Sequence, residues 1–250
     1  MTAKAHDTDN EDVFPMRLNK YLAHQGVATR RDADVLIEKG RVLINGKPAK
    51  VGMKVSEGDA VEVLQKGGAA KKLHYVAYHK PRGVITHSAK DGEEDIISIL
   101  PFEFQRLGLF PVGRLDKDSY GLIVLTNDGR ITDRLLRPDA EHEKEYSVHT
   151  KLPLRPSFKQ HMETGVDIEG YMTKPAKIRV TGEHTFSITL TEGKKHQIRR
   201  MVVAMHNEVT DLKRTRVMNI RLGNLKSGQA RNIEGEELVE FLESLNLPMQ

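Results

Sequence analysis

The amino-acid sequence predicts an α+β protein with two folded units: a small helix-helix-sheet unit, then a larger unit with a mixed, mainly antiparallel sheet flanked by helices. In the larger unit, strand-like and helix-like apolar patterns are interspersed without a regular βαβ rhythm, which favours this class over a parallel α/β fold. A segment with two adjacent glycines and three lysines at 65–73 interrupts the apolar pattern and separates the units. The 250 residues, 38% of them hydrophobic, are sufficient for two cores.

The chain begins with a polar segment, which is followed by two short helices. Residues 1–15 are acidic and lack apolar periodicity, so we expect them to form a disordered tail. From Met16 the apolar residues recur at helical spacing until Gly26, where this helix is expected to end. Thr29, with an acidic residue three positions later, resembles a capping box and starts a second helix that ends at Gly40.

Three short strands complete the first unit, which spans residues 16–64. Residues 41–47 predict a strand that runs into an Asn-Gly turn. Alternating apolar residues at 51–55 and at 61–63 predict two further strands. The segment 65–73 that follows is expected to be a flexible linker.

The second unit, residues 74–247, contains most of the predicted elements. Apolar runs or alternation predict strands at 74–79, 120–126, 144–150, 176–181, 184–191 and 216–222. Apolar residues at helical spacing predict helices at 129–137, 155–163, 195–206 and 234–245. The sequence contains no internal repeat, so the two units are not copies of one another.

The net charge of +4 conceals a segregated distribution of charge. Segments 17–54 and 193–221 each carry a net charge of +6, whereas residues 1–15 carry −3 and residues 232–250 carry −5. Two basic segments in a chain with acidic ends favour a polyanionic partner, most often nucleic acid. Two solvated basic surfaces are the alternative interpretation of the charge alone.

Several classes of function have no support in the sequence. The chain has no Cys, and its histidines form no HxH or HxxxH pair, so a disulfide framework, a thiol nucleophile and a zinc site are not expected. The phosphate-loop, dinucleotide-binding, GxSxG and HExxH motifs are missing, and we expect neither a cofactor nor a metal. No apolar run approaches the ~20 residues of a membrane helix, and residues 1–12 have no apolar stretch, so we do not expect them to act as a secretory signal. We therefore expect a cytoplasmic protein without a membrane partner.

A polar turn before an apolar strand carries the first candidate for chemistry. Residues 114–119 form this turn, and residues 122–125 are expected to be buried. A carboxylate at the mouth of a buried strand is costly to desolvate, which points to a function for Asp116. Asp is also common in turns, where it only accepts backbone hydrogen bonds. Together with Asp118, Asp116 could also indicate a metal-dependent nuclease, although two carboxylates alone are weak support for one.

Two further segments hold charged or aromatic candidates. Arg199 and Arg200 lie near the start of a predicted helix whose other face is apolar. Two adjacent arginines on a half-buried helix need an anionic partner, either a carboxylate or phosphate oxygens. Tyr146 lies near the start of the strand 144–150, where an isolated Tyr is typical of an aromatic at the edge of the core.

Together, these segments resemble the RNA pseudouridine synthases, and best the branch that modifies single uridines in ribosomal RNA. GRLDKDSYGL at 113–122, EKEY at 143–146 and GKKHQIRRM at 193–201 are similar, in this order, to the three motifs of that family. The runs MRLNKYL, RRDADVLI and GRVLING within residues 16–46 resemble the S4 RNA-binding domain. The resemblance covers nearly the whole chain apart from the acidic tail.

The resemblance implies an isomerisation that needs no cofactor, in which uracil is detached from its ribose, turned and rejoined through carbon 5. It implies that Asp116 is the catalytic carboxylate, which attacks the ribose or the base or acts as a base at the ribose. Arg199, at the family's Gln-apolar-Arg position, would pair with Asp116 and keep it ionised. Tyr146 would stack on the target base and help to remove the proton from carbon 5. The uridine must be flipped out of folded RNA, and Arg114 is the candidate to fill the vacated space, with a phosphate or turn contact as its alternative.

The resemblance of the first unit implies RNA contacts there as well. The residues expected to bind phosphates are Arg17, Lys20, Arg30, Arg31 and Arg41. His24 shares a helix face with the first two of them. A solvated basic surface is the alternative interpretation of this group.

We therefore expect a monomeric RNA pseudouridine synthase whose partner is ribosomal RNA. Large-subunit (23S) RNA is preferred because LFPVGRLDKDS at 109–119 resembles the large-subunit members, some of which also act on a transfer RNA. The alternatives are an enzyme for small-subunit ribosomal RNA or transfer RNA, and a non-catalytic RNA-binding or ribosome-assembly protein. An intact set of Asp116, Tyr146 and Arg199 argues against the non-catalytic alternative.

Overall fold

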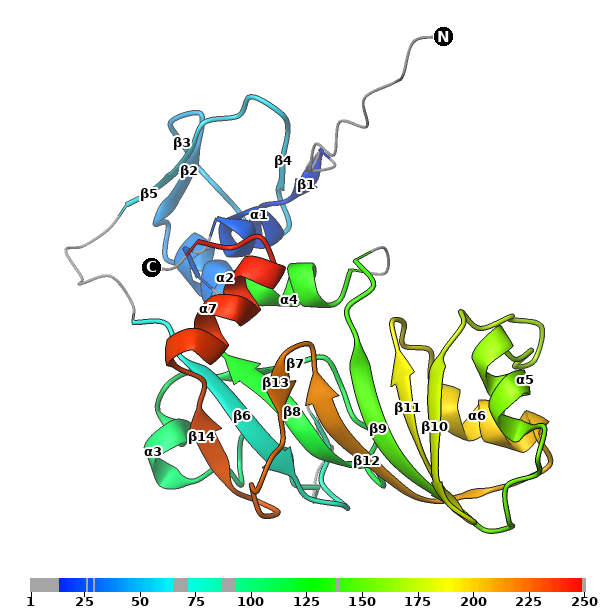
Figure 1. Ribbon diagram of the computed structural model, residues 1–250. Helices are drawn as coiled ribbons and strands as arrows, with labels where there is room; N and C mark the ends of the chain where they lie inside the picture. The colour runs from blue at the N-terminus through cyan, green and yellow to red at the C-terminus, as the bar shows by residue number, and fades with distance from the viewer. Residues whose placement is uncertain are drawn as a thin grey trace, which may run out of the picture. The chain divides into compact units, whose positions relative to one another are not determined.

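The computed structural model describes residues 14–25, 27–28, 30–64, 72–86, 93–137 and 140–248. Contacts divide the chain into two compact units, Met1–Lys71 and Lys72–Gln250 (Figure 1). Most of the expected tail, the expected cap residues Gly26 and Thr29, and most of the expected linker lie outside the described residues.

The first unit has two helices and two small antiparallel sheets. Its elements are β1 (Met16–Arg17), α1 (Leu18–His24), α2 (Arg30–Glu38), β2 (Val42–Ile44), β3 (Lys47–Pro48), β4 (Lys54–Val55) and β5 (Val61–Val63). One sheet has the order β3-β2-β5, and β1 pairs with β4. Leu18 and Leu22 of α1 pack against Ala33 and Ile37 of α2, because residues four apart share one face of a helix. The two helices and the strands β2, β4 and β5 lie within the segments that the sequence predicts, whereas β1 was not predicted.

The second unit is built on one nine-stranded sheet. Its strands are β6 (Tyr75–Lys80), β7 (Phe110–Val112), β8 (Tyr120–Thr126), β9 (Lys144–Thr150), β10 (Lys177–Gly182), β11 (Thr185–Leu190), β12 (Val209–Val217), β13 (Ile220–Arg221) and β14 (Ala230–Asn232). Seven strands follow the order β10-β11-β9-β12-β8-β6-β14, while β7 pairs with β8 and β13 with β12. Among these strand pairs, β12 and β8 run parallel and the others antiparallel, so the expected mixed, mainly antiparallel sheet is confirmed.

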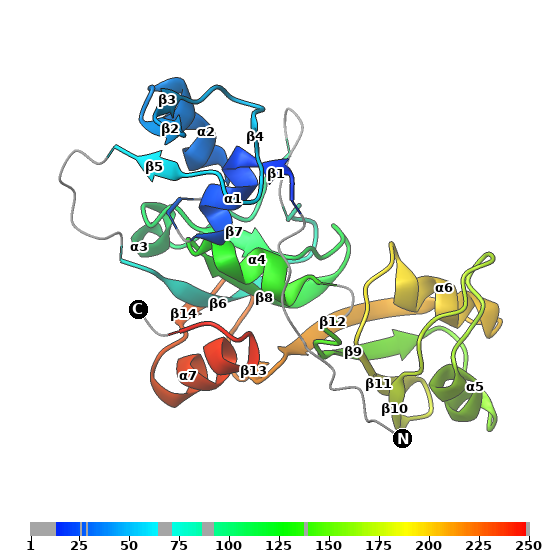
Figure 2. The same cartoon turned by 90° about the horizontal axis from the view of Figure 1, so that it is seen from above.

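The two halves of this sheet are covered differently. The helices are α3 (Phe102–Gln105), α4 (Gly129–Leu135), α5 (Phe158–Thr164), α6 (Gln197–Ala204) and α7 (Gly235–Ser244). The half with β6 and β8 packs against α4 and α7 on one face, and against α3 and the segment before it on the other. The half with β9, β11 and β12 packs against α5 and α6 on one face (Figure 2). Burial on both faces explains why β8 is a continuous apolar run, whereas β11 alternates.

The largest difference from the predicted elements is β12, which covers 209–217 where only 216–222 was predicted as a strand. Three of its seven added residues, Asp211, Lys213 and Arg214, are charged, which interrupts the apolar alternation that a strand prediction needs. Arg214, for example, lies inside the sheet and is only 3% exposed. The short elements β7, β14 and α3 were not predicted either, because three or four residues carry no periodic signal.

Candidate active site

The loop with Asp116 leads into β8 near the point where the pairing partner of β8 changes from β12 to β7. β8 pairs with β7 from Val124 to Thr126, and with β12 at Tyr120 and Gly121. At Gly121, φ is +108° and an added Cβ would lie 2.3 Å from the carbonyl oxygen of Arg214. Only glycine allows β12 to approach this closely, so Gly121 fixes the position where the loop 113–119 emerges.

A buried lysine anchors the loop from one side. The Lys80 ammonium donates to the carbonyl oxygens of Ser119 at 2.8 Å, Pro81 at 2.9 Å and Lys117 at 3.4 Å. Its side chain is fully buried, and burial lowers the pKa of Lys80 to about 8, although the charges of Asp116 and Asp118 oppose that shift. This role could not be predicted from the sequence, since a lysine that ends an apolar strand usually reaches solvent.

A buried arginine supports the same loop from below. Arg214 donates from Nε to the carbonyl oxygen of Leu122 at 2.6 Å and from Nη1 to that of Arg114 at 3.4 Å. Arg214 therefore connects β12 to both β8 and the loop. Lys80 and Arg214 place two buried cations under a loop that carries carboxylates, which favours an anionic group at this position.

The loop meets the start of α6 at Asp116. Oδ1 of Asp116 lies 3.5 Å from Nε2 of His196, and the two side chains are 41% and 50% exposed. His196 is the N-cap residue of α6 and has a left-handed backbone with φ 52° and ψ 29°. This conformation is uncommon for a residue with a Cβ, and such residues cluster at functional sites. Two sequence motifs about 80 residues apart thus converge on one accessible carboxylate.

The expected ion pair between Asp116 and Arg199 is not formed among the described residues. Arg199 donates from Nη1 to the carbonyl oxygen of Val209 at 3.1 Å, because its side chain follows α6 toward the start of β12. His196, one turn nearer the N-terminus of the helix, makes the contact with Asp116 instead. Arg200 is held on another side by the carbonyl oxygen of Ile168 at 2.6 Å and a carboxylate oxygen of Glu169 at 2.7 Å.

Of the two other candidates of this unit, Arg114 lies in the loop itself and Tyr146 lies opposite Arg214, which binds the loop. Tyr146 is half-buried on β9, opposite Ile188 of β11 and Arg214 of β12, and it packs against the core beneath α6. Arg114 is exposed, and its carbonyl oxygen is held by Arg214. The structure therefore brings Asp116, Arg114 and Tyr146 to one region around Arg214.

The segment that follows β8 has a structural role. Asp128 caps α4 and receives hydrogen bonds from the Arg130 guanidinium at 2.7 and 2.9 Å and from the Tyr75 hydroxyl at 2.8 Å. Its side chain is 0% exposed, and burial together with the Asp128 charge raises the pKa of Tyr75. This buried network belongs to the fold, not to the accessible site at Asp116.

In the first unit, the expected RNA-binding residues are accessible and carry no ion pair within the described residues. Arg17, Arg30 and Arg31 are exposed, while Lys20 and Arg41 are half-buried. Arg17 lies directly opposite Lys54 in the β1–β4 pair, which concentrates positive charge there. A group of cations without carboxylate partners is suited to phosphate binding.

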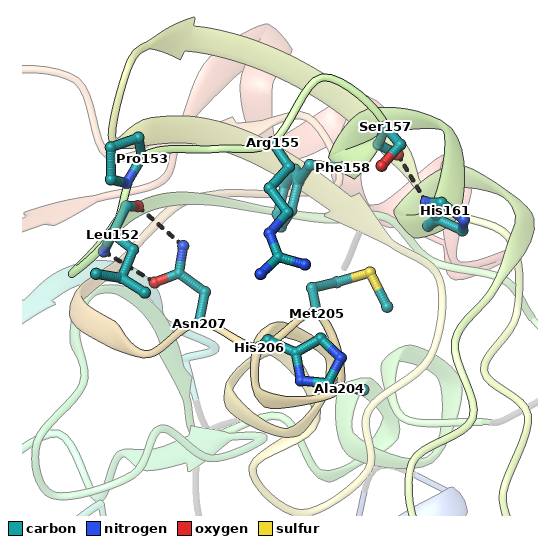
Figure 3. Close-up of a pocket in the computed structure, with 10 residues that line it drawn as sticks. All are labelled: Leu152, Pro153, Arg155, Ser157, Phe158, His161, Ala204, Met205, His206 and Asn207. Carbon is teal, nitrogen blue, oxygen red and sulfur yellow. Dashed lines mark hydrogen bonds between the residues drawn. The ribbon is translucent and has the colours of Figure 1, made fainter.

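Other features of the described residues do not point to a second catalytic centre. A cavity of about 210 Å³ lies between α5 and the end of α6, and none of the predicted site residues lines it (Figure 3). The described residues contain no group of three or more His, Asp or Glu side chains that could hold a metal ion. In the part of the chain that the structure describes, no helix is long and apolar enough to span a membrane.

Comparisons with known proteins assign both units. Residues 74–204 match the model of the RNA pseudouridylate synthase family, and residues 16–61 match that of the S4 domain. The dual-specificity RNA pseudouridine synthase RluF of Salmonella typhi is 42% identical over 228 residues, which are 90% of this chain and 78% of the relative. Ribosomal large subunit pseudouridine synthase B of Bacillus subtilis is 34% identical, with 89% and 93% covered. A crystal structure of a pseudouridylate synthase is 28% identical with a TM-score of 0.67, and the match covers 90% of this chain and 99% of that one.

Proposed function

Because the chain belongs to the RNA pseudouridylate synthase family, we propose that it isomerises a specific uridine of ribosomal RNA to pseudouridine, with Asp116 as its catalytic carboxylate. The observation that carries the assignment of Asp116 is its position at the meeting point of the loop 113–119 and α6, 3.5 Å from His196. The carboxylate is accessible to a substrate, while buried Lys80 and Arg214 hold the loop that presents it. A rigid loop with a reactive group on its surface is what positioned catalysis requires.

The reaction needs only a rearrangement within one nucleotide. The bond between N1 of uracil and C1′ of ribose breaks, uracil turns, and a bond between C5 and C1′ forms. The proton on C5 leaves, and N1 gains one, so atoms and electrons balance without an oxidant or a second substrate. Asp116 acts on the ribose or the base in the first step.

The other site residues act around this carboxylate. Tyr146 offers an aromatic ring at the edge of the core, on which the flipped base stacks, and such stacking contributes ~1–3 kcal/mol per base. It also assists removal of the proton from C5. Arg114 is exposed on the loop and fills the space that the base vacates in the RNA. Arg199 approaches Asp116 or a neighbouring phosphate in the substrate complex.

The RNA is held at both units. The exposed cations of the S4 unit, Arg17, Arg30 and Arg31 among them, contact phosphates and contribute affinity without reading sequence. One chain contains both the RNA-binding unit and the catalytic unit, which supports a monomeric enzyme that acts in the cytoplasm, where ribosomal RNA is found.

Large-subunit (23S) ribosomal RNA is the proposed substrate. A relative named for the ribosomal large subunit supports this choice. Another relative is named a dual-specificity RNA pseudouridine synthase, which agrees with a second RNA substrate, and we propose a transfer RNA for it. Small-subunit ribosomal RNA is the alternative, and a non-catalytic role in ribosome assembly is the alternative from another class.

Mapping of pseudouridine in cells tests the proposal. Ribosomal and transfer RNA from cells that lack the protein are compared with RNA from cells complemented by the natural chain or by the Asp116→Asn variant. We expect one site or a few sites in large-subunit RNA to lose pseudouridine, and only the natural chain to restore it. Restoration by the variant, or no lost site in any RNA, would contradict the proposed function.

A further inference from the structure

A cluster of charged and aromatic side chains borders the catalytic loop and has no part in the mechanism above. The Tyr120 hydroxyl donates to Oδ2 of Asp211 at 2.8 Å, and Arg82 forms an ion pair with the same carboxylate. The Arg82 guanidinium also lies over the Tyr120 ring, 4.9 Å from its centroid. Lys213, opposite Tyr120 on β12, has its ammonium 6.0 Å from the same centroid.

This cluster lies next to Asp116 along the chain and in space. Tyr120 is the first residue of β8 and follows the loop directly. The turn with Arg82 is bound to the loop, because Gly83 N–H donates to the carbonyl oxygen of Lys117 at 2.8 Å. An RNA strand whose uridine reaches Asp116 therefore passes close to Arg82.

The Tyr120 ring at the centre of the cluster is packed against a second ring, that of His79. His79 stacks on Tyr120 with centroids 6.0 Å apart and planes inclined by 14°. Nδ1 of His79 donates to the carbonyl oxygen of Leu225 at 2.7 Å, so the imidazole cannot rotate away. Burial, together with the charge of Lys213, lowers the pKa of His79, and a neutral ring behind Tyr120 does not repel the two cations.

The charges of the cluster do not balance. The cluster has one carboxylate, Asp211, which pairs with Arg82, and Lys213 forms no ion pair with a carboxylate in the described part of the chain. The Arg82 side chain is 47% exposed, although the aromatic ring and the carboxylate fix its direction. A pre-oriented guanidinium with an open edge beside an unpaired ammonium is suited to a phosphate group, which guanidinium binds through two parallel hydrogen bonds.

We propose that Arg82 and Lys213, oriented by Tyr120 and Asp211, form a binding site for a backbone phosphate of the RNA strand next to the target uridine. This inference rests on the proposed function, since the strand must enter the site at Asp116. Arg82 and Lys213 contact the phosphate, while Tyr120 and Asp211 are positioning residues that act through Arg82.

The test measures equilibrium binding of the full-length Asp116→Asn variant to a ribosomal RNA fragment over a range of salt concentrations. Adding Arg82→Gln is expected to lower the affinity roughly 3- to 10-fold and to reduce the slope of log affinity against log salt by about 0.7–0.9, the value for one phosphate contact. Adding Arg82→Lys keeps the charge but removes the planar guanidinium that donates two parallel hydrogen bonds. It is therefore expected to weaken binding while keeping the slope.

Arg106→Gln is the matched control, because Arg106 also lies over an exposed aromatic ring. Its guanidinium is 5.0 Å from the centroid of Phe102. The residue beside it, Leu107, is bound to Asn127, which follows the far end of β8 from Tyr120. The control variant is expected to change neither affinity nor slope. Equal results for Arg82→Gln and Arg106→Gln would overturn the proposal, as would a loss of affinity without a change of slope, which would indicate a base stacked on Arg82.

Variants of Tyr120 separate orientation from direct contact. Tyr120→Leu removes the ring beneath Arg82 and is expected to reproduce part of the loss seen for Arg82→Gln, whereas Tyr120→Phe keeps the ring and most of the affinity. An effect of Tyr120→Leu that persists in the Arg82→Gln variant would contradict a role through Arg82. A natural chain that shows the Arg82-dependent slope but forms no pseudouridine would contradict the proposed function and leave this phosphate site standing.

Discussion

Nε2 of His196 lies 3.5 Å from Oδ1 of Asp116, so an imidazole, and not the expected guanidinium of Arg199, contacts the proposed catalytic carboxylate. His196 makes this contact from a left-handed backbone at the start of α6. A side chain with a Cβ in that conformation costs free energy, so the position exchanges stability for placement of the imidazole.

Two substitutions of His196 separate these effects. His196→Gly and His196→Ala both remove the imidazole and are expected to lower kcat/KM equally, by no more than about fivefold, because an exposed contact of this kind contributes under about 1 kcal/mol. Only glycine relieves the left-handed strain, so His196→Gly should have a free energy of unfolding about 1 kcal/mol above that of His196→Ala. Denaturant unfolding and steady-state kinetics measure both quantities, and equal stabilities would show that the backbone is not strained.

Lys80 should make stability depend on pH above neutrality. The pKa of Lys80 is about 8 in the folded chain and 10.5 without burial, so between these values the unfolded chain binds a proton that the folded chain has lost. The contribution of Lys80 to the free energy of unfolding therefore increases as the pH is raised from 8 to 10.5. The full effect is on the order of 3 kcal/mol.

The Lys80→Met variant isolates this effect. Lys144, whose pKa is also lowered to about 8 by burial, titrates in both proteins and cancels from the difference. The free energy of unfolding of the natural chain minus that of Lys80→Met is expected to rise between pH 8 and pH 10.5. A difference that is flat or falls in urea unfolding over this range would show that burial does not disfavour the ammonium.

Asp128 should matter for stability and not for chemistry. Asp128→Ala leaves the Arg130 guanidinium, 8% exposed, without its carboxylate, which typically costs about 3–5 kcal/mol. Tyr75→Phe removes one hydrogen bond to Asp128 and is expected to cost only about 1 kcal/mol. Thermal unfolding of the two variants checks the order of these effects. An Asp128→Ala variant that melts at the natural temperature but has no activity would contradict this and place Asp128 in the reaction.

The S4 unit should contribute affinity without taking part in the reaction. It has its own core, formed by residues of α1, α2 and the short strands. Removal of residues 1–64 is expected to weaken RNA binding and to lower its salt dependence, because the segment 17–54 carries a net charge of +6. Isomerisation should persist at high RNA concentration. An unchanged salt slope after truncation would show that this unit does not contact phosphates in the complex.

The sequence predicted those parts of the fold that follow one periodic pattern. The predicted strands at 120–126 and 144–150 agree with β8 and β9 because their apolar residues are local signals. β12 was largely missed because Arg214 is buried through hydrogen bonds to Leu122 and Arg114, which only the folded sheet supplies. Hydrophobicity carries no information about such a cation.

The same distinction between local signals and tertiary contacts applies to the candidate site. The polar turn around Asp116 is visible in the sequence, since a carboxylate beside an apolar run is unusual. The anchoring of the turn by Lys80 and the contact with His196 depend on tertiary structure and left no local signal. The contact of Arg199 with the Val209 carbonyl oxygen was not predicted for the same reason, because spacing along α6 does not determine which side chain reaches the loop.

The most direct test of the account is the purified Asp116→Asn variant, assayed on RNA labelled with tritium at carbon 5 of uridine. Isomerisation releases the hydrogen on that carbon, so tritium in the solvent measures the reaction itself. The substitution is nearly isosteric and the side chain is 41% exposed, so folding and most RNA affinity should be kept. We expect the variant to bind and melt like the natural chain and to release no tritium above background. Release near the natural rate would show that Asp116 is not the catalytic residue.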